Sequence, residues 1–164
     1  MLPKRLLLAF AATLVLALPA RAAEVIELTW EDLVPGLDTF VAKGLVEHGQ
    51  AAATIDYDTI AAAGTVADYN GKTIALAGFV VPLDLDSTLV REFLLVPYIG
   101  ACIHVPPPPP NQIVFVKAAK PIKITGLFDA VIVTGVMSTP DLIATDLADI
   151  GYQIDAQTIV DYQF

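Results

Sequence analysis

Two residues with metal-binding and nucleophilic side chains stand close together in the chain. Cys102, the single cysteine, and His104 lie two positions apart in the stretch GACIHVP. Side chains at positions i and i+2 of an extended strand project from the same face, so both groups would point the same way. A thiolate and an imidazole are ligands for zinc and also suit copper, although no methionine cluster favours Cu(I). The pair therefore predicts a metal site that needs one or two further ligands.

Three carboxylates upstream are candidates for the remaining ligands. Asp84 and Asp86 lie in a polar stretch, and Glu92 lies on the strand expected to follow it. A closed sheet would bring these segments near Cys102 and His104. Two ligands at one spacing are much less specific than two CxxC pairs, so a buried cysteine with a hydrogen-bonded histidine remains an alternative.

Thiol catalysis is a further alternative for the same pair. His104 would activate Cys102 as a nucleophile, and backbone amides near Gly100 would bind an anion. Alternate residues on a strand are about 6–7 Å apart at Cα, so direct activation requires a bend. Gly100 could supply that bend.

Five consecutive prolines follow, and they predict a stiff polyproline II rod of about 3.1 Å per residue. As a strut, the rod would join two strands and hold ACIH rigid. As a ligand, it would dock with Tyr98 into an aromatic groove of a partner protein. We favour the strut, because the rod lies between two expected strands and not in a free tail. The residues concerned are Pro106, Pro107, Pro108, Pro109 and Pro110.

The first residues predict a secretory signal peptide over residues 1–22. Lys4 and Arg5 precede a short apolar run, and small residues before position 23 fit cleavage after Ala22. The run is too short to span a bilayer, and no later segment offers about 18 consecutive apolar residues. A cysteine just after the run would indicate lipidation, but Cys102 is far downstream. We therefore expect a freely periplasmic protein with no transmembrane segment after cleavage.

Charge and cysteine content narrow the classes of partner. The leader takes three of the nine basic residues and none of the 18 acidic ones, which leaves a net charge of −12. Binding to nucleic acid depends on clustered Lys and Arg, so this balance argues against it. One cysteine cannot form a disulfide within the chain, even in an oxidising compartment.

Residues 23–65 are expected to form an N-terminal extension that packs on the main domain. An apolar alternation ends at Trp30, and Thr29 with Asp32 predicts a capping box for a short helical turn. The alanine-rich stretch beyond predicts one or two short helices. It contains His48, which is interpreted as an exposed polar residue, with a distant metal ligand as the alternative.

Residues 66–164 read as the main domain, with several short strands and little helix. Asn70-Gly71 between alternating segments predicts a β-hairpin with a type I′ turn. Strands are expected at REFLLVPY, QIVFVKA, DAVIVTGVMS and YQIDAQTIVDYQF, while Thr139 and Pro140 predict the start of a helix. This pattern is typical of a mainly β barrel or sandwich.

The blocks FVVPLD and REFLLVPYIGACIHVPPPPPNQIVFV, with the V.V.G strand after them, closely resemble a bacterial family of secreted proteins known as domain of unknown function 3299. The resemblance covers roughly residues 66–160. It implies a periplasmic protein with a small OB-like β-barrel of about five to seven strands and one or two short helices, often encoded beside transport systems and suspected of zinc handling. Its hallmark residues are Pro97, Tyr98, Gly100, Cys102, His104, prolines 106–110, Asn111 and Gln112.

These observations predict a periplasmic metal-binding accessory protein, with zinc as the ion, associated with an envelope transport system. One alternative is a non-enzymatic interaction module that uses Tyr98 and the prolines against an envelope transporter or a periplasmic protein. A second alternative is a thiol-dependent enzyme. We favour a protein without catalytic activity over this alternative.

Overall fold

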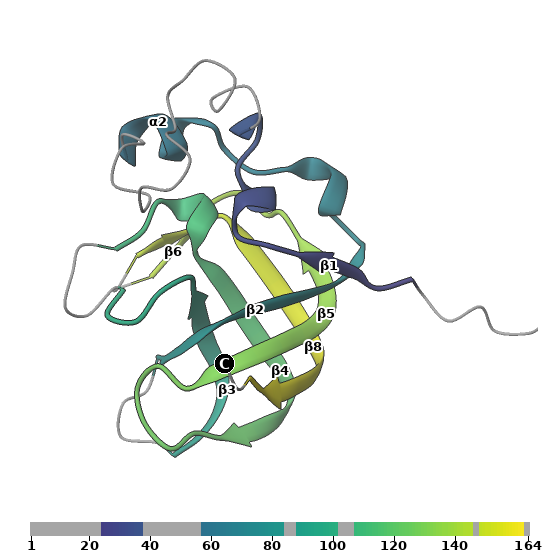
Figure 1. Cartoon of the computed structure of the whole chain (residues 1–164), viewed down its shortest axis with the longest axis vertical. Helices are drawn as coiled ribbons and strands as arrows, with labels where there is room; N and C mark the ends of the chain where they lie inside the picture. The colour runs from purple at the N-terminus through teal and green to yellow at the C-terminus, as the bar shows by residue number, and fades with distance from the viewer. Residues whose placement is uncertain (1–23, 38–56, 84–87, 102–106, 146–147, 163–164) are drawn as a thin grey trace, which may run out of the picture.

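Five long strands close into a barrel in the computed structural model, which describes residues 24–37, 57–83, 88–101, 107–145 and 148–162 (Figure 1). Their order around the barrel is β2-β3-β4-β8-β5, and β5 pairs back onto β2. All neighbours are antiparallel except β4 and β8, which run parallel. The small OB-like barrel is thereby confirmed. The strands are β2 (Thr73–Pro82), β3 (Leu89–Val96), β4 (Val114–Lys123), β5 (Ala130–Ser138) and β8 (Tyr152–Asp161).

The short elements gather towards one end of this barrel (Figure 1). Among them, β1 runs parallel to the first half of β2, with Ile26 opposite Ile74, whereas β3 pairs with β2 only from Phe79 onward. Strand β1 covers the apolar alternation that ends at Trp30, and it occupies the edge that β3 leaves open. The short elements are β1 (Ile26–Leu28), η1 (Glu31–Leu33), α2 (Tyr57–Ala62), η2 (Ala67–Tyr69), η3 (Pro110–Gln112), β6 (Ile143–Ala144) and β7 (Asp149–Ile150).

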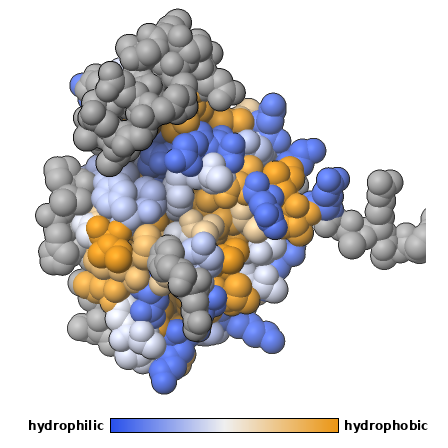
Figure 2. Space-filling view, viewed as in Figure 1, coloured by the Kyte–Doolittle hydropathy of each residue, from blue (hydrophilic) through white to orange (hydrophobic). Residues whose placement is uncertain are grey.

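Alternation of side chains fills the barrel. Along β2 and β5, buried residues alternate with partly exposed ones, because successive side chains of a strand point to opposite faces. The core contains Ile74, Phe93, Val133 and Tyr152, all with no more than a trace of exposed surface. On the outside, Figure 2 shows hydrophobic side chains in separate patches among hydrophilic ones.

A second, smaller cluster lies outside the main core. We call it the loop cluster, because it joins strand residues to residues of the connection between β3 and β4. Its buried members are Val81, Leu94, Val96, Ala101, Ile113 and Ile150. Apolar packing therefore fixes part of the connection that carries Cys102 and His104.

The predicted hairpin at Asn70-Gly71 is wrong. Asn70 has φ −61° and ψ 124°, Gly71 has φ 76°, and Lys72 N–H donates to the Tyr69 carbonyl at 3.0 Å. These angles define a type II turn, which needs glycine only at its third position. No strand precedes the turn, because residues 67–69 form η2, so the turn leads from a helical segment into β2.

The predicted helix after Thr139 is also wrong. Residues 143–144 and 149–150 form the antiparallel pair β6–β7 instead. Ile143 packs against the loop cluster and Ile150 belongs to it. A two-strand arrangement places both side chains on that cluster, and this packing overrides the local helix-start signal of Thr139 and Pro140.

The helical turn predicted near Trp30 is present as η1, but its N-cap is Trp30 and not Thr29, and only the bond from the Thr29 backbone to Asp32 matches the predicted capping box. Thr29 donates from its backbone N–H and its hydroxyl to Asp32 Oδ2, both at 2.8 Å, and this pair stabilises the start of η1. Trp30 Nε1–H donates to the Ala77 carbonyl at 2.8 Å, which ties the segment to β2. None of the helices in the described part of the chain combines the length and the apolar character needed to cross a membrane.

Candidate functional site

The connection from β3 to β4 carries the predicted chemistry, and its first described part is firmly held. Gly100 has φ 92°, a left-handed conformation that glycine adopts without a Cβ penalty. Ala101, the next residue, is fully buried in the loop cluster. The chain therefore enters residue 102 from a fixed position.

The far part of the same connection is fixed by the prolines. Pro107 is exposed, but Pro108 and Pro109 are buried. The backbone then enters η3, where Gln112 N–H donates to the Pro109 carbonyl at 2.8 Å. Burial of two prolines supports the strut over the freely projecting ligand.

Most of the predicted metal ligands lie outside the described residues. This holds for Cys102, His104, Asp84 and Asp86, as well as for Pro106 and His48. Within the described ranges, no group of three or more His, Cys, Asp or Glu side chains could hold a metal ion. The predicted set of ligands therefore stays a prediction.

Glu92 is the one predicted ligand whose surroundings are described. It is exposed on β3 and lies in register with Lys117 of β4. Lys117 Nζ lies 5.4 Å from the centroid of the Phe115 ring. A lysine directly across the strands is close enough to attract the Glu92 carboxylate, and it would weaken that carboxylate as a ligand for a cation.

Strand β3 also separates the two loops that carry the other predicted ligands. One loop precedes Leu89 and the other follows Val96, at opposite ends of the strand. At about 3.4 Å per residue, these ends are roughly 24 Å apart. Ligands from both loops would meet only if the loops span that length.

Two exposed apolar side chains follow β3. Tyr98 is 43% exposed and Ile99 is 67% exposed, just before the buried Gly100 and Ala101. Of the residues predicted to bind a partner, Tyr98 and Pro107 are therefore at the surface.

Beneath this connection, the barrel end is tied to the N-terminal segment, by which we mean residues 24–37 and 57–66. The first tie is Tyr152, which is fully buried. Its hydroxyl donates to the Leu33 carbonyl at 2.8 Å and accepts from Val66 N–H at 2.6 Å. Burial raises the pKa of Tyr152 from 10.0 to about 12, although the hydrogen bond from Val66 opposes that rise.

The second tie is Asn111 in η3, whose side chain is 1% exposed. Its Nδ2 donates to the carbonyls of Ile60 at 2.7 Å and Gly64 at 2.9 Å. Its Oδ1 is buried and has no hydrogen-bond partner among the described residues. A buried amide oxygen without a donor is uncommon in folded proteins, and it lowers the net stabilisation that this tie provides.

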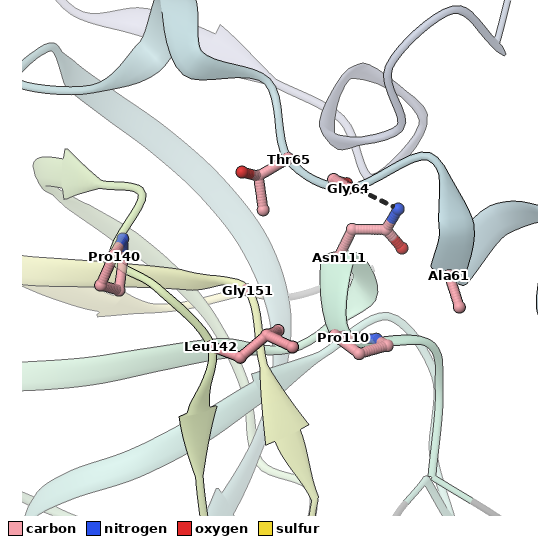
Figure 3. A pocket seen from close by; sticks show the side chains of 8 residues that line it. All are labelled: Ala61, Gly64, Thr65, Pro110, Asn111, Pro140, Leu142 and Gly151. Carbon is pink, nitrogen blue, oxygen red and sulfur yellow. Dashed lines mark hydrogen bonds between the residues drawn. The ribbon is translucent and has the colours of Figure 1, made fainter.

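A pocket of about 170 Å³ lies beside this amide. In Figure 3 the Asn111 nitrogen faces Gly64, its oxygen faces Ala61, and Thr65, Pro140 and Leu142 lie on the other side. The pocket joins residues far apart in sequence, from α2 and the residues just after it, η3, the segment before β6 and the residue between β7 and β8. Its lining residues are Ala61, Gly64, Thr65, Pro110, Asn111, Pro140, Leu142 and Gly151.

Sequence reasoning missed the roles of Asn111 and Tyr152. Asn111 was noted only as part of the hallmark block, and Tyr152 only as the first residue of a closing strand. One local signal exists for Asn111, because an amide pair, Asn111-Gln112, stands between a proline run and an apolar strand. Gln112 in fact donates from Nε2 to the Trp30 carbonyl at 2.8 Å, a third contact to the N-terminal segment.

Comparisons with known proteins agree with this fold. The model of a family described as protein of unknown function (DUF3299) matches residues 30–161. The chain is also similar to a DUF3299 family protein from Pseudomonas aeruginosa whose crystal structure is known. The two share 37% sequence identity and superimpose with a TM-score of 0.65, and the match covers 87% of this chain and 99% of that chain. No curated protein matches the sequence. The chain therefore belongs to the DUF3299 family of proteins of unknown function.

Proposed function

We propose that this protein is a periplasmic metal-binding accessory protein of an envelope transport system. In this proposal, Cys102 and His104 bind a divalent ion such as zinc, and a carboxylate from Asp84, Asp86 or Glu92 completes the site. Sulfur and imidazole nitrogen are ligands that zinc prefers, so the donor chemistry fits this ion.

One observation carries the proposal. The backbone on both sides of Cys102 and His104 is anchored by burial, at Ala101 on one side and at Pro108 and Pro109 on the other. A pair of ligands binds an ion more tightly when supporting residues hold the ligands in place beforehand. The acidic chain, with a formal net charge of −9, also attracts cations.

Metal content of the tag-free protein tests the proposal. We expect about one zinc per chain in the wild type by elemental analysis, and less than a tenth of that in Cys102→Ser and His104→Gln, because each removes one ligand. His48→Gln is the matched control, since it removes the other histidine and should leave the zinc content unchanged. A wild type that keeps no zinc and melts at the same temperature with and without added zinc would refute metal binding.

The carboxylates are separated by single substitutions. Asp84→Asn, Asp86→Asn and Glu92→Gln each keep the size of the side chain and remove its charge. We expect one of the three to weaken zinc binding by at least tenfold in a competition titration with a chelator. Equal affinity for all three variants and the wild type would show that no carboxylate of this set is a ligand.

The exposed pair Tyr98 and Ile99 favours a second candidate, an interaction module. Its contact surface would consist of these two residues and Pro107, because Pro108 and Pro109 are buried. Ile99→Ser should then abolish binding to one envelope protein that the wild type retains, with the zinc content unchanged. Leu89→Ser is the matched control, since Leu89 is 60% exposed and lies at the opposite end of β3.

A further inference from the structure

We propose that the free edge of strand β8 pairs with an extended acidic segment of a partner protein. By the free edge we mean residues 157–161, which have a neighbouring strand on one side only within the described ranges. The acidic segment would add one strand beside β8, and its carboxylates would lie near Lys120 and Lys123 of β4. This site does not depend on the proposed metal ligands.

Strands β4 and β8 pair along only part of their length. Their parallel pairing ends at Ala118 and Ala156. Beyond these residues β4 pairs only with β3, and β8 pairs only with β5, in the part of the chain that the structure describes. A strand that lacks a neighbour presents a row of unpaired backbone N–H and C=O groups, which is a template for another strand.

The exposure of the side chains shows that this opening is accessible. All but one of residues 157–161 on β8 are exposed, and the same holds for residues 119–123 on β4. Ile154, an inward residue of the paired half of β8, is fully buried. Ile122 and Ile159 also pack against the core, but both are partly exposed. The core is therefore less completely covered where the pairing of β4 and β8 has ended.

The two strands differ in how well they accept another strand at this opening. On β4, Lys120 and Pro121 interrupt the edge, and lysine and proline are residues by which natural proteins block edge pairing. The free edge of β8 contains neither residue type. Its Thr158, Ile159 and Val160 are β-branched, which favours strand pairing. An incoming acidic segment would therefore pair with β8.

Two lysines of β4 determine the charge of the incoming segment. Lys120 and Lys123 are exposed, and the strand pairing places no carboxylate of a described residue opposite either of them. Lys123 lies opposite Leu89 instead. A segment beside β8 would direct every second side chain outward. Carboxylates at those positions would meet the opposite charge of the two lysines.

Other charged residues limit where these carboxylates can lie. Lys117 already has Glu92 and Asp155 in register on its two sides, so it offers little to a ligand. Asp161 ends the free edge and would repel an adjacent carboxylate. The acidic positions of the incoming segment therefore lie beside residues 157–160, between β8 and the two lysines.

Three peptides of equal length test the pairing. The probe is acetyl-Glu-Val-Glu-Val-Glu-amide, and two comparison peptides replace each glutamate with glutamine or each valine with proline. We expect the probe to bind the full chain with a dissociation constant on the order of a millimolar, in an NMR titration at low ionic strength. Each comparison peptide should bind at least about fivefold more weakly, because the first lacks the charge and the second lacks backbone N–H donors. A comparison peptide that binds as tightly as the probe overturns the proposal.

Two measurements locate the bound probe. It should slow the hydrogen exchange of backbone N–H groups within residues 157–161, since new hydrogen bonds form there. The double variant Lys120→Gln and Lys123→Gln should weaken its binding by at least about threefold. Lys72→Gln is the matched control, because Lys72 is also exposed but precedes β2 at the other end of the barrel. Slowed exchange only outside the free edge, equal weakening in the control, or no binding of the probe at about 20 mM refutes the site.

Discussion

The N-terminal segment meets the barrel at two buried polar residues with different hydrogen-bond balances. At Tyr152, one hydroxyl donates to Leu33 and accepts from Val66, so its donor is used and both backbone groups are satisfied. At Asn111, the two donors are used and the acceptor has no partner within the described residues. The first tie therefore has all of its hydrogen bonds, whereas the second keeps one buried acceptor without a donor.

This difference leads to a ranking of variants. Removing a satisfied polar group leaves its former partners unpaired, at a cost of about 1–3 kcal/mol for each buried one. Removing a buried polar group that has an unpaired atom of its own, such as Asn111 Oδ1, also removes the desolvation cost of that atom. Substitution at Tyr152 should therefore be more destabilising than substitution at Asn111.

The largest effect is expected for Tyr152→Phe. The free energy of unfolding should fall by about 2–4 kcal/mol, because Val66 N–H and the Leu33 carbonyl both lose their partner. Urea denaturation measures this value. Tyr162→Phe, at an exposed tyrosine near the end of β8, is the control and should change stability by less than about 0.5 kcal/mol. Similar losses in the two variants would show that the buried hydroxyl has no special role.

Alkaline pH should weaken the Tyr152 tie in the wild type. The folded-state pKa is about 12, above the ordinary value of 10.0, so folding favours the protonated phenol. This contribution is complete below pH 10 and is lost as pH rises to about 12, and it amounts to roughly 3 kcal/mol. The stability gap between wild type and Tyr152→Phe, measured by urea denaturation at each pH, should therefore narrow over this range. A constant gap contradicts the raised pKa.

Asn111→Leu should cost less, about 1–2 kcal/mol. Leucine matches the branching of asparagine, and the change leaves the carbonyls of Ile60 and Gly64 without their donor but also removes the unpaired Oδ1. Gly64 is exposed, so water can replace its lost bond. A loss in urea denaturation as large as that of Tyr152→Phe would contradict the distinction between the two ties.

The smallest effect is expected at the turn between β4 and β5. There Asp129 accepts from the backbone N–H of Thr125 at 2.6 Å and from its hydroxyl at 2.8 Å. Both residues are close in sequence and their hydrogen bonds are exposed, so Thr125→Val should cost about 0.5 kcal/mol or less. Thermal denaturation measures the change. A loss above that of Asn111→Leu would mean that this local turn matters more than the long-range ties.

The sequence predicted the strands of the barrel because their signal is local. Alternation of apolar and polar residues repeats every two positions, and it identifies β2, β5 and β8 without knowledge of their neighbours. The closing strand order is a property of pairings between distant segments, and the OB-like fold came from the family resemblance.

Local signals failed where distant packing decided the outcome. Asn70-Gly71 is a strong hairpin signal, but the chain before it forms η2 and the edge of β2 is taken by β1. Thr139 and Pro140 resemble a helix start, but Ile143 and Ile150 are used by the loop cluster. The ties of Tyr152 and Asn111 connect residues 119 and 51 positions apart, and no short pattern reports such contacts.

The predicted metal site stays a prediction, unlike the strands and the turns. Cys102 and His104 were selected from residue type and spacing alone, and the described residues give the anchors around them but not the pair itself. Pattern reasoning identifies which side chains have suitable chemistry. The distances between the loops at opposite ends of β3 depend on how the barrel closes. Residue types and their spacing in the sequence do not report that closure.

The contacts of the N-terminal segment have a consequence for folding. Trp30 bonds to Ala77, 47 residues later, its carbonyl is bound by Gln112, 82 residues later, and Leu33 is bound by Tyr152, 119 residues later. The part of the chain that is synthesised first therefore acquires its partners last. Contacts of such long sequence separation slow folding, and a chain that ends before β8 would leave Leu33 without the hydroxyl that holds it.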